Sequence, residues 1–251
     1  MRSAEFDRDG CLRFDATQSS LAWARAARSA AITVSQHPAT QAANLRHGRT
    51  WFVGVDALPT SRTGEIGGVE LNGPWDAYLP STKPLHPAQL SIIYPGYPQR
   101  DATQSDANHR YRVERFAAHM DGLLPTPGQR RAASEFHAYV LGIGLGGCTA
   151  APTMYWPGSH HILGYAMREA IGDGDPQDFD VTEAYHAARK EVFAKIAPVA
   201  LPCAFGASFL LHRFTLHGTA PWGDAPSVEE GRMIAFFRPE FTDTTDWLTR
   251  P

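Results

Sequence analysis

The stretch SFLLHRFTLHGT, residues 208–219, is the most informative part of the sequence for the fold. It is a short apolar run that ends at a Gly-Thr pair, which is typical of a buried β-strand that stops at a turn. We therefore expect a strand over 208–217. The next apolar run, 232–238, predicts another strand, and the polar segment 223–227 between the two predicts a turn or loop. This part of the chain is expected to be β-structure.

The same pattern of short apolar runs and turn residues extends toward the N-terminus. Helical composition or a three-to-four apolar spacing predicts helices over 19–31, 160–171 and 181–196. Runs bounded by Pro and Gly predict the remaining strands, which cover 51–55, 89–94, 110–121, 137–145 and 153–156. This order predicts a mostly β fold, a barrel or jelly roll with flanking helices and helices inserted between its strands.

Composition limits the class of protein. The chain has 251 residues, 43% of them hydrophobic, and contains no linker, so we expect a single domain over 1–251. A net charge of −3 argues against a nucleic-acid partner, and no apolar run is long enough to span a membrane. There is no apolar leader, and Cys11, Cys148 and Cys203 are odd in number and far apart. These features predict a cytoplasmic protein with reduced thiols.

The triplet His119-Met120-Asp121 is the first candidate for chemistry. On a strand, residues two apart share a face, so both side chains could hold one metal ion. A chain with 11 histidines can contain such a triplet by chance, but His217, at the end of the 208–217 run, offers a third ligand. His212 is its rival; five residues separate the two, so on one strand only one of them faces inward. The expected site is His119, Asp121 and His217.

Two histidines and one carboxylate on one face of an iron ion leave three coordination positions open. Those positions suit a chelating 2-oxo acid and dioxygen. Arg232 opens the otherwise apolar run 232–238, and an inward-facing arginine there needs an anionic partner. Thr219 shares the strand parity of His217 and is expected beside that anion.

Taken together, these motifs resemble the phytanoyl-CoA dioxygenase superfamily of Fe(II)- and 2-oxoglutarate-dependent oxygenases. The matching residues, in the family's order, are His119-Met120-Asp121, Pro157-Gly158-Ser159-His160, His217-Gly218-Thr219 and Arg232. The resemblance covers about 85–240, the expected barrel core, with 1–84 packed on it as an N-terminal helix and strands. It implies a double-stranded β-helix (jelly-roll) barrel in which His119, Asp121 and His217 ligate Fe(II).

The resemblance also implies the reaction. A dioxygenase of this family uses O2 and 2-oxoglutarate to hydroxylate a small-molecule metabolite and releases succinate and CO2. Arg232 would clamp the distal carboxylate of 2-oxoglutarate. It follows His217 by 15 residues, a longer gap than is usual in the family, so Arg238 is the reserve candidate.

Arg115 is the candidate for substrate binding. If 110–121 is one regular strand, Arg115 shares the inward face of His119 and Asp121, whereas Arg110 and Arg112 face outward. We expect Arg115 to anchor an anionic group of the substrate, unless it forms a structural ion pair.

Two other classes of protein remain open. A cupin-type metalloenzyme would use the same barrel and ligands without 2-oxoglutarate, and it would not need a buried anion clamp at Arg232. A non-catalytic barrel that binds a small molecule would not need three metal ligands, which are costly to bury. The sequence does not identify the substrate or the oligomeric state.

Overall fold

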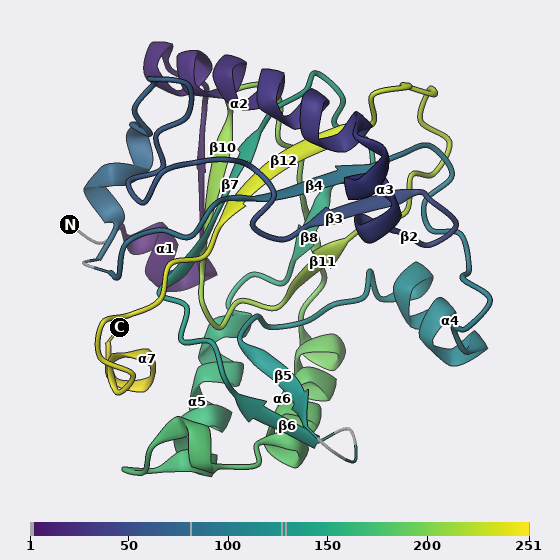
Figure 1. Cartoon of the computed structure of the whole chain (residues 1–251). Helices are drawn as coiled ribbons and strands as arrows, with labels where there is room; N and C mark the ends of the chain where they lie inside the picture. Colours follow the sequence, from purple (N-terminus) through teal and green to yellow (C-terminus); the bar gives the residue numbers. More distant parts are fainter. Residues whose placement is uncertain (1–2, 81, 127, 129, 251) are drawn as a thin grey trace.

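The structure, a computed structural model, describes residues 3–80, 82–126, 128 and 130–250 (Figure 1). Its largest element is an antiparallel sheet with the strand order β1-β10-β7-β12-β4-β3-β2. The strands of this major sheet are β1 (Cys11–Phe14), β2 (Leu45–Arg46), β3 (Trp51–Gly54), β4 (Gln89–Ile93), β7 (Tyr139–Gly144), β10 (Ser208–His212) and β12 (Arg232–Phe237).

The central strands of the major sheet are continuous apolar runs because both faces of the sheet are covered. Every residue of β7 and β10 is buried. Their register places Leu141 opposite Leu210, and β12 pairs with β7 through Ala235 and Ile143. On the neighbouring strand β3 the burial alternates, because Phe52 faces the core while Trp51 and Val53 are half-buried on the other face.

A minor sheet covers the inner face of the major one. It has the order β11-β8-β9, with β8 at Thr153–Tyr155, β9 at Val199–Leu201 and β11 at His217–Thr219. Tyr155 and Leu201 of this sheet pack against Val140, Leu211 and Ile234 of the major sheet. The two sheets therefore form one layered core, and the candidate site lies beside this layer.

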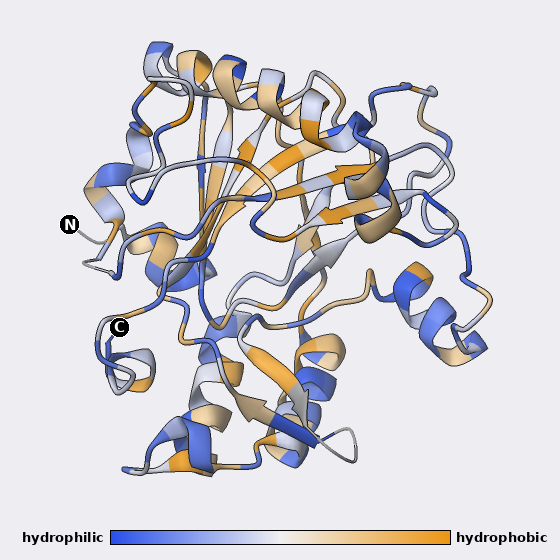
Figure 2. Ribbon diagram, in the orientation of Figure 1, coloured by the Kyte–Doolittle hydropathy of each residue, from blue (hydrophilic) through white to orange (hydrophobic). Residues whose placement is uncertain are grey.

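Helix α2 (Gln18–Gln36) lies across the outer face of the major sheet (Figure 1). Thr17 caps it, and the helix buries Trp23 and three alanines against the sheet. Hydrophilic and hydrophobic residues alternate along this helix, and the strands beneath it carry many hydrophobic residues (Figure 2). The small alanines allow the helix to approach the strands closely. The other N-terminal helices are α1 (Ala4–Asp9) and α3 (Pro38–Asn44), and a 3₁₀ turn covers Pro74–Tyr78.

Two helices and a hairpin lie on the side of the molecule opposite helix α2 (Figure 1). Helices α5 (Ser159–Ile171) and α6 (Thr182–Lys195) are inserted between β8 and β9, as the sequence predicts, with a 3₁₀ turn at Pro176–Asp178. They lie next to the hairpin of β5 (Leu123–Thr126) and β6 (Arg130–Ala133) (Figure 1). The last helices are α4 (Asp106–Glu114) and α7 (Asp246–Thr249). In the described part of the chain, no helix is long and apolar enough to cross a membrane.

The prediction of mostly antiparallel sheet with flanking helices is confirmed. Two local predictions are wrong. The segment 110–121 is not a strand, because Ser105 caps helix α4 there. The segment 208–217 is not one strand either, because β10 ends at His212 and β11 begins at His217 in the other sheet.

The first 84 residues do more than pack on a core at 85–240. Strand β1 pairs with β10, and β3 pairs with β4, so N-terminal strands are part of the major sheet. All three cysteines are free, as expected.

Candidate metal centre

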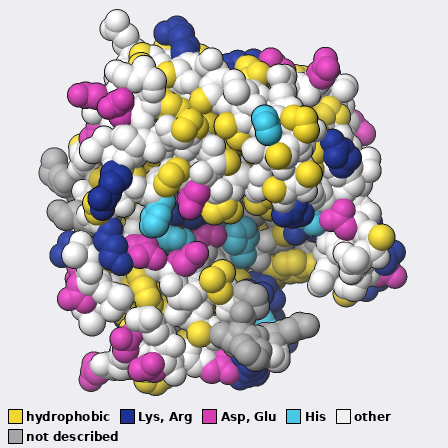
Figure 3. All heavy atoms as spheres, in the orientation of Figure 1, with side chains coloured by type: hydrophobic (Ala, Val, Ile, Leu, Met, Phe, Trp, Pro, Cys, Tyr) yellow, Lys and Arg dark blue, Asp and Glu magenta, His cyan; other side chains and the backbone are white. Residues whose placement is uncertain are grey.

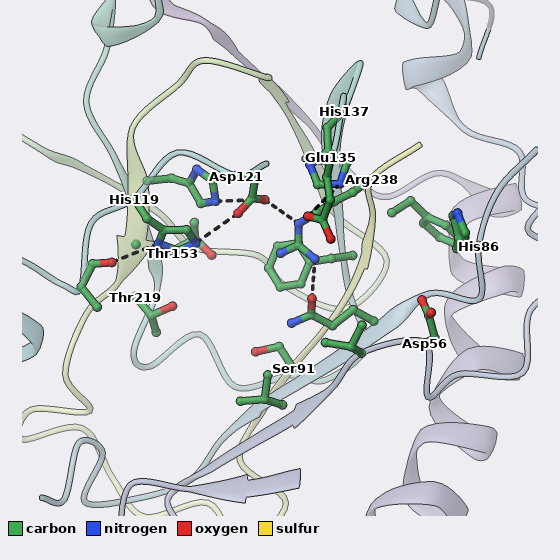
Figure 4. Close-up of a pocket in the computed structure, with 18 of the residues that line it drawn as sticks. Asp56, His86, Ser91, His119, Asp121, Glu135, His137, Thr153, Thr219 and Arg238 are labelled. Atoms are coloured by element: carbon green, nitrogen blue, oxygen red, sulfur yellow. Dashed lines mark hydrogen bonds and ion pairs between the residues drawn. The ribbon is translucent and has the colours of Figure 1, made fainter. Parts of the chain in front are cut away.

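His119, Asp121 and His217 come together at one end of the minor sheet (Figure 4). One potential ligand atom from each lies within 4.8 Å of the other two. His119 and His217 also bond to each other through the main chain, with N–O distances of 2.8 and 3.0 Å in the two directions. The backbone bridge sets the spacing of the two rings, whose centroids are 4.7 Å apart. Sequence reasoning placed all three residues together, and the structure does so.

Both imidazole rings are held in the orientation that a metal ligand needs. The Nδ1 atom of His119 lies 3.0 Å from the carbonyl oxygen of Ala117, and that of His217 lies 3.0 Å from the carbonyl oxygen of Thr215. A carbonyl only accepts hydrogen bonds, so each Nδ1 is the donor, and each Nε2 is the ring atom left to face a metal ion. The two Nε2 atoms face Asp121, at 3.2 Å from Oδ1 and 3.6 Å from Oδ2.

The electrostatics favour the protonation states that bind metal. Burial lowers the pKa of His217 to about 4, although the nearby Asp121 acts to raise it. Burial acts to raise the pKa of Asp121, but the charge of Arg238 and the two histidines outweigh it and hold this pKa well below its usual value. At neutral pH the site therefore offers a neutral imidazole from His217 and an ionised carboxylate.

Arg238 lies directly beside the three residues. Its Nε donates to Asp121 Oδ2 at 2.5 Å, and its Nη1 donates to Gln89 Oε1 (Figure 4). Arg238 therefore orients the carboxylate of Asp121 from the side of the major sheet. The reserve candidate for the 2-oxoglutarate clamp is already engaged with two partners.

A cavity of about 540 Å³ opens from the three residues. It lies between the sheets, and its lining includes Trp51 and Val53 on β3, Gln89 and Ser91 on β4, and Phe236 and Phe237 on β12. Histidine side chains gather near the middle of the face in Figure 3, with acidic and basic side chains beside them. The cavity has the size and the mixed lining of a small-molecule site.

Arg232 is buried beyond the end of this cavity and does not line it. Its Nε and Nη2 donate to the carbonyl oxygen of Ala151 at 3.1 and 2.9 Å, and its buried Nη1 has no partner among the described residues. Burial lowers the pKa of Arg232 to about 10. A guanidinium that is buried with only a carbonyl for partner calls for an anion.

Two threonines of the minor sheet, Thr153 and Thr219, lie near His119 in Figure 4. Thr153 follows the Arg232 partner Ala151 by two residues, and its buried hydroxyl has no hydrogen bond among the described residues. Thr153 and Thr219 are register partners, and both line the cavity. The predicted position of Thr219 on the face of His217 therefore fits the structure. Unused donors at Arg232 and Thr153 fit a carboxylate of 2-oxoglutarate.

Arg115 is not where the sequence argument placed it. Strand alternation does not apply, because Arg115 is the C-terminal cap of helix α4. Its guanidinium lies over the ring of Phe193 at 5.1 Å, and the residue is exposed and does not line the cavity. Arg112, which was expected to face outward, does line it.

His212 lies apart from the three residues. It packs against Phe6, His160 and Phe214 and does not line the cavity. The choice of His217 over His212 therefore agrees with the geometry, although the single strand assumed for it is wrong.

Sequence reasoning missed Arg112, Glu135 and His137, which also line the cavity. A signal existed for Arg112: Ser105 is a good helix cap, and Asp106 suits a first turn, so a helix could have been predicted there. Glu135 and His137 carried no such signal, because only tertiary structure brings them beside Asp121.

No protein-family model and no curated protein matches the sequence. Solved structures do match its fold. The non-haem α-ketoglutarate-dependent carbocyclase SnoK from nogalamycin biosynthesis aligns with a TM-score of 0.52 and 15% identity, over 95% of this chain and 82% of that one. The epimerase SnoN, in complex with Fe3+, α-ketoglutarate and nogalamycin RO, aligns with a TM-score of 0.50 and 14% identity, over 95% and 81%.

At these identities the likeness extends to the fold. Both neighbours are enzymes that use α-ketoglutarate, which is 2-oxoglutarate. The resemblance expected from the sequence motifs is thus confirmed at the level of the fold.

Proposed function

We propose that this chain is a mononuclear non-haem Fe(II)- and 2-oxoglutarate-dependent dioxygenase that acts on a small molecule, with residues 1–251 as one domain and the strands closing as a jelly-roll barrel. The observation that carries the proposal is the trio His119, Asp121 and His217, with both imidazoles held by backbone carbonyls so that their Nε2 atoms face the carboxylate of Asp121. Two histidines and a carboxylate are the ligand set of non-haem iron oxygenases.

In this proposal His119, Asp121 and His217 hold Fe(II). The iron, when bound, supplies the activation of dioxygen that a hydroxylation requires. The chain's own part is to fix the ligands. The carbonyls of Ala117 and Thr215 keep the two rings in one tautomer, and Arg238 keeps Asp121 ionised and oriented.

Arg232 binds the distal carboxylate of 2-oxoglutarate in this proposal, with Thr153 and Thr219 beside the co-substrate. The support is the unused Nη1 of Arg232 and the unused hydroxyl of Thr153. Arg238 is the weaker candidate because its guanidinium already binds Asp121 and Gln89.

A cupin-type metalloenzyme that does not use 2-oxoglutarate is the second candidate. One observation favours it: Arg232 does not line the cavity in this structure. The third possibility, a barrel without catalysis, has no such support.

Metal and co-substrate binding test the proposal. The chain is purified metal-free and supplied with Fe(II) under anaerobic conditions, and 2-oxoglutarate binding is measured by calorimetry. Succinate formation in air, with a panel of small metabolites, then reports turnover. We expect one Fe(II) per chain, and 2-oxoglutarate binding that depends on the metal. Metal binding without 2-oxoglutarate binding would favour the cupin-type enzyme, and absence of metal binding would contradict both.

A further inference from the structure

We propose that Arg112, seated against Trp51 on the cavity wall, anchors an anionic group of the primary substrate, a carboxylate or a phosphate. The proposal rests on the proposed function, because it names the substrate class of the same cavity. It replaces Arg115 with a different arginine of the same segment.

Arg112 interacts with the charge of Asp101, but that carboxylate accepts hydrogen bonds from the backbone N–H groups of His47 and Gly48 and forms no ion pair with Arg112. Its Nη1 donates to the hydroxyl of Tyr97 at 2.9 Å, and its guanidinium carbon lies 5.3 Å from the centre of the Trp51 ring. Its Nε is buried without a hydrogen bond in the described part of the chain. No ion pair joins Arg112 to a carboxylate of a described residue. A half-buried guanidinium with one neutral partner and an aromatic ring can still take a forked anion.

Neighbouring groups keep Arg112 in this position. Trp51 donates from its indole to the hydroxyl of Ser91 at 3.0 Å, and Tyr97 packs edge-on against Trp51. His47 stacks on the same indole and adds no second positive charge at neutral pH, because burial, and then the charge of Arg112, lower the pKa of His47 to about 4. Arg112 is therefore held against a rigid aromatic support, which lowers the entropy lost on binding.

The other charges of the cavity direct an anion toward Arg112. Arg238, the other arginine among the lining residues, is ion-paired with Asp121. Asp56, Glu135 and Glu240 also line the cavity, and in Figure 4 Asp56 lies well away from His119 and Thr219. An anionic group is repelled by these carboxylates and attracted by Arg112.

The remaining lining gives the chemistry of the rest of the ligand. Trp51, Val53, Phe116 and Phe236 present apolar surface to the cavity. The substrate class is thus a small molecule with an apolar or aromatic body and one acidic group. Arg112 would hold the acidic group and so set which part of the body reaches the metal ligands.

The test compares acids with their uncharged amides. The probes are benzoate, phenylacetate and 3-phenylpropionate, each with its primary amide, and phenyl phosphate. Their binding to the protein loaded with Mn(II) and 2-oxoglutarate is measured by calorimetry. The variants are Arg112→Met and Arg112→Lys, and the matched control is Arg115→Met, which removes an arginine three residues away on the same segment.

We expect at least one of the acids to bind about tenfold or more tightly than its uncharged counterpart. This preference should disappear in Arg112→Met, return in part in Arg112→Lys and persist in Arg115→Met, with 2-oxoglutarate affinity unchanged throughout. Melting temperatures identify any variant that fails to fold. If Arg112→Met does not fold, the acid preference measured in Arg112→Lys tests the inference.

Three results would overturn the inference: no acid preference in the wild-type protein, the same preference in Arg112→Met, or an equal loss of 2-oxoglutarate affinity in Arg112→Met. A different result is expected if the proposed function is wrong but the inference about Arg112 is right. The wild-type protein then does not bind 2-oxoglutarate, and it still prefers acids, through Arg112, when 2-oxoglutarate is left out.

Discussion

Strand β12 begins with Arg232 and is followed directly by Arg238, and these two arginines lie in very different environments. Arg238 is partly exposed to the cavity and forms an ion pair with Asp121. Arg232 is 2% exposed, and among the described residues its guanidinium bonds only to the carbonyl of Ala151. Both have the same strand parity, so the neighbours, and not the strand, determine what each charge does. Arg238 orients Asp121, whereas Arg232 has an unused donor that the proposed function assigns to an anion.

The largest expected effect is on Fe(II) affinity, at the three residues beside Arg238. His119→Ala, Asp121→Ala or His217→Ala should lower Fe(II) affinity by a hundredfold or more, because each removes one of three ligands. Metal content after equilibrium dialysis measures this loss. His212→Ala is the matched control and should keep its iron; a His212 variant that loses iron while His217→Ala retains it would overturn the assignment.

The metal-free protein should lose stability as pH falls from 6.5 to about 4. Burial lowers the pKa of both His217 and His137 to about 4, while an unfolded histidine titrates near 6.5. In that window the unfolded chain takes up protons that the folded chain does not, so acid favours unfolding. The cost is about 1.4 kcal/mol per histidine for each pH unit.

Urea unfolding at pH 7 and pH 5 measures this effect. Asp121 acts in the same direction but at lower pH, because its lowered pKa adds stability that is lost as the pH falls below the usual range of an aspartate. His217→Gln should reduce the slope between pH 7 and pH 5. An unchanged slope in that variant would show that His217 is not a source of the acid sensitivity.

At the Arg232 end of the strand, the expected effect is on the affinity for 2-oxoglutarate. Arg232→Ala should weaken the binding of 2-oxoglutarate at least about tenfold, since a hydrogen bond to a charged group contributes about 1.5–3 kcal/mol. Calorimetry with the metal-loaded protein measures it. If the affinity falls in Arg238→Ala and not in Arg232→Ala, the clamp is at the other end of the strand.

The smallest effect is expected for Arg238→Gln. This change removes the ion pair to Asp121 and leaves the three proposed ligands in place, so Fe(II) affinity should fall by about tenfold, the lower end of the cost of losing such an orienting partner. The affinity for 2-oxoglutarate should not change once the metal is saturating. Competition with a metal-binding dye gives the measurement, and a loss as large as that of Asp121→Ala would make Arg238 essential to the centre.

Sequence patterns predicted what depends on local spacing. His119 and Asp121 were found because a two-residue spacing brings side chains together, and His217 was found because of the Gly-Thr that follows it. The same rule failed for Arg115, since alternation holds only on a strand and this residue caps a helix. The break between His212 and His217 was missed because a distant contact marks it: Arg213 donates to the carbonyl of Trp247 at 2.7 Å.

The Arg238–Asp121 pair was also beyond prediction. The two residues are 117 positions apart, and only the approach of β12 to the segment after α4 brings them together. The expectation that Arg238 would reach solvent or a carboxylate at the rim was consistent with its charge, but the partner could not be identified from the sequence.

A metal ion bound by His119 and His217 would also have a mechanical role, at the point where the backbone already bridges the two residues. A bound ion would join two points 98 residues apart in the chain (217 − 119), much as a covalent cross-link does. In the chain-entropy view, closing a loop of that length stabilises a fold by about 4–5 kcal/mol. Metal loading should therefore slow hydrogen exchange at the amides of these two histidines. A bound iron ion would then be a reversible cross-link between the segment after α4 and the minor sheet.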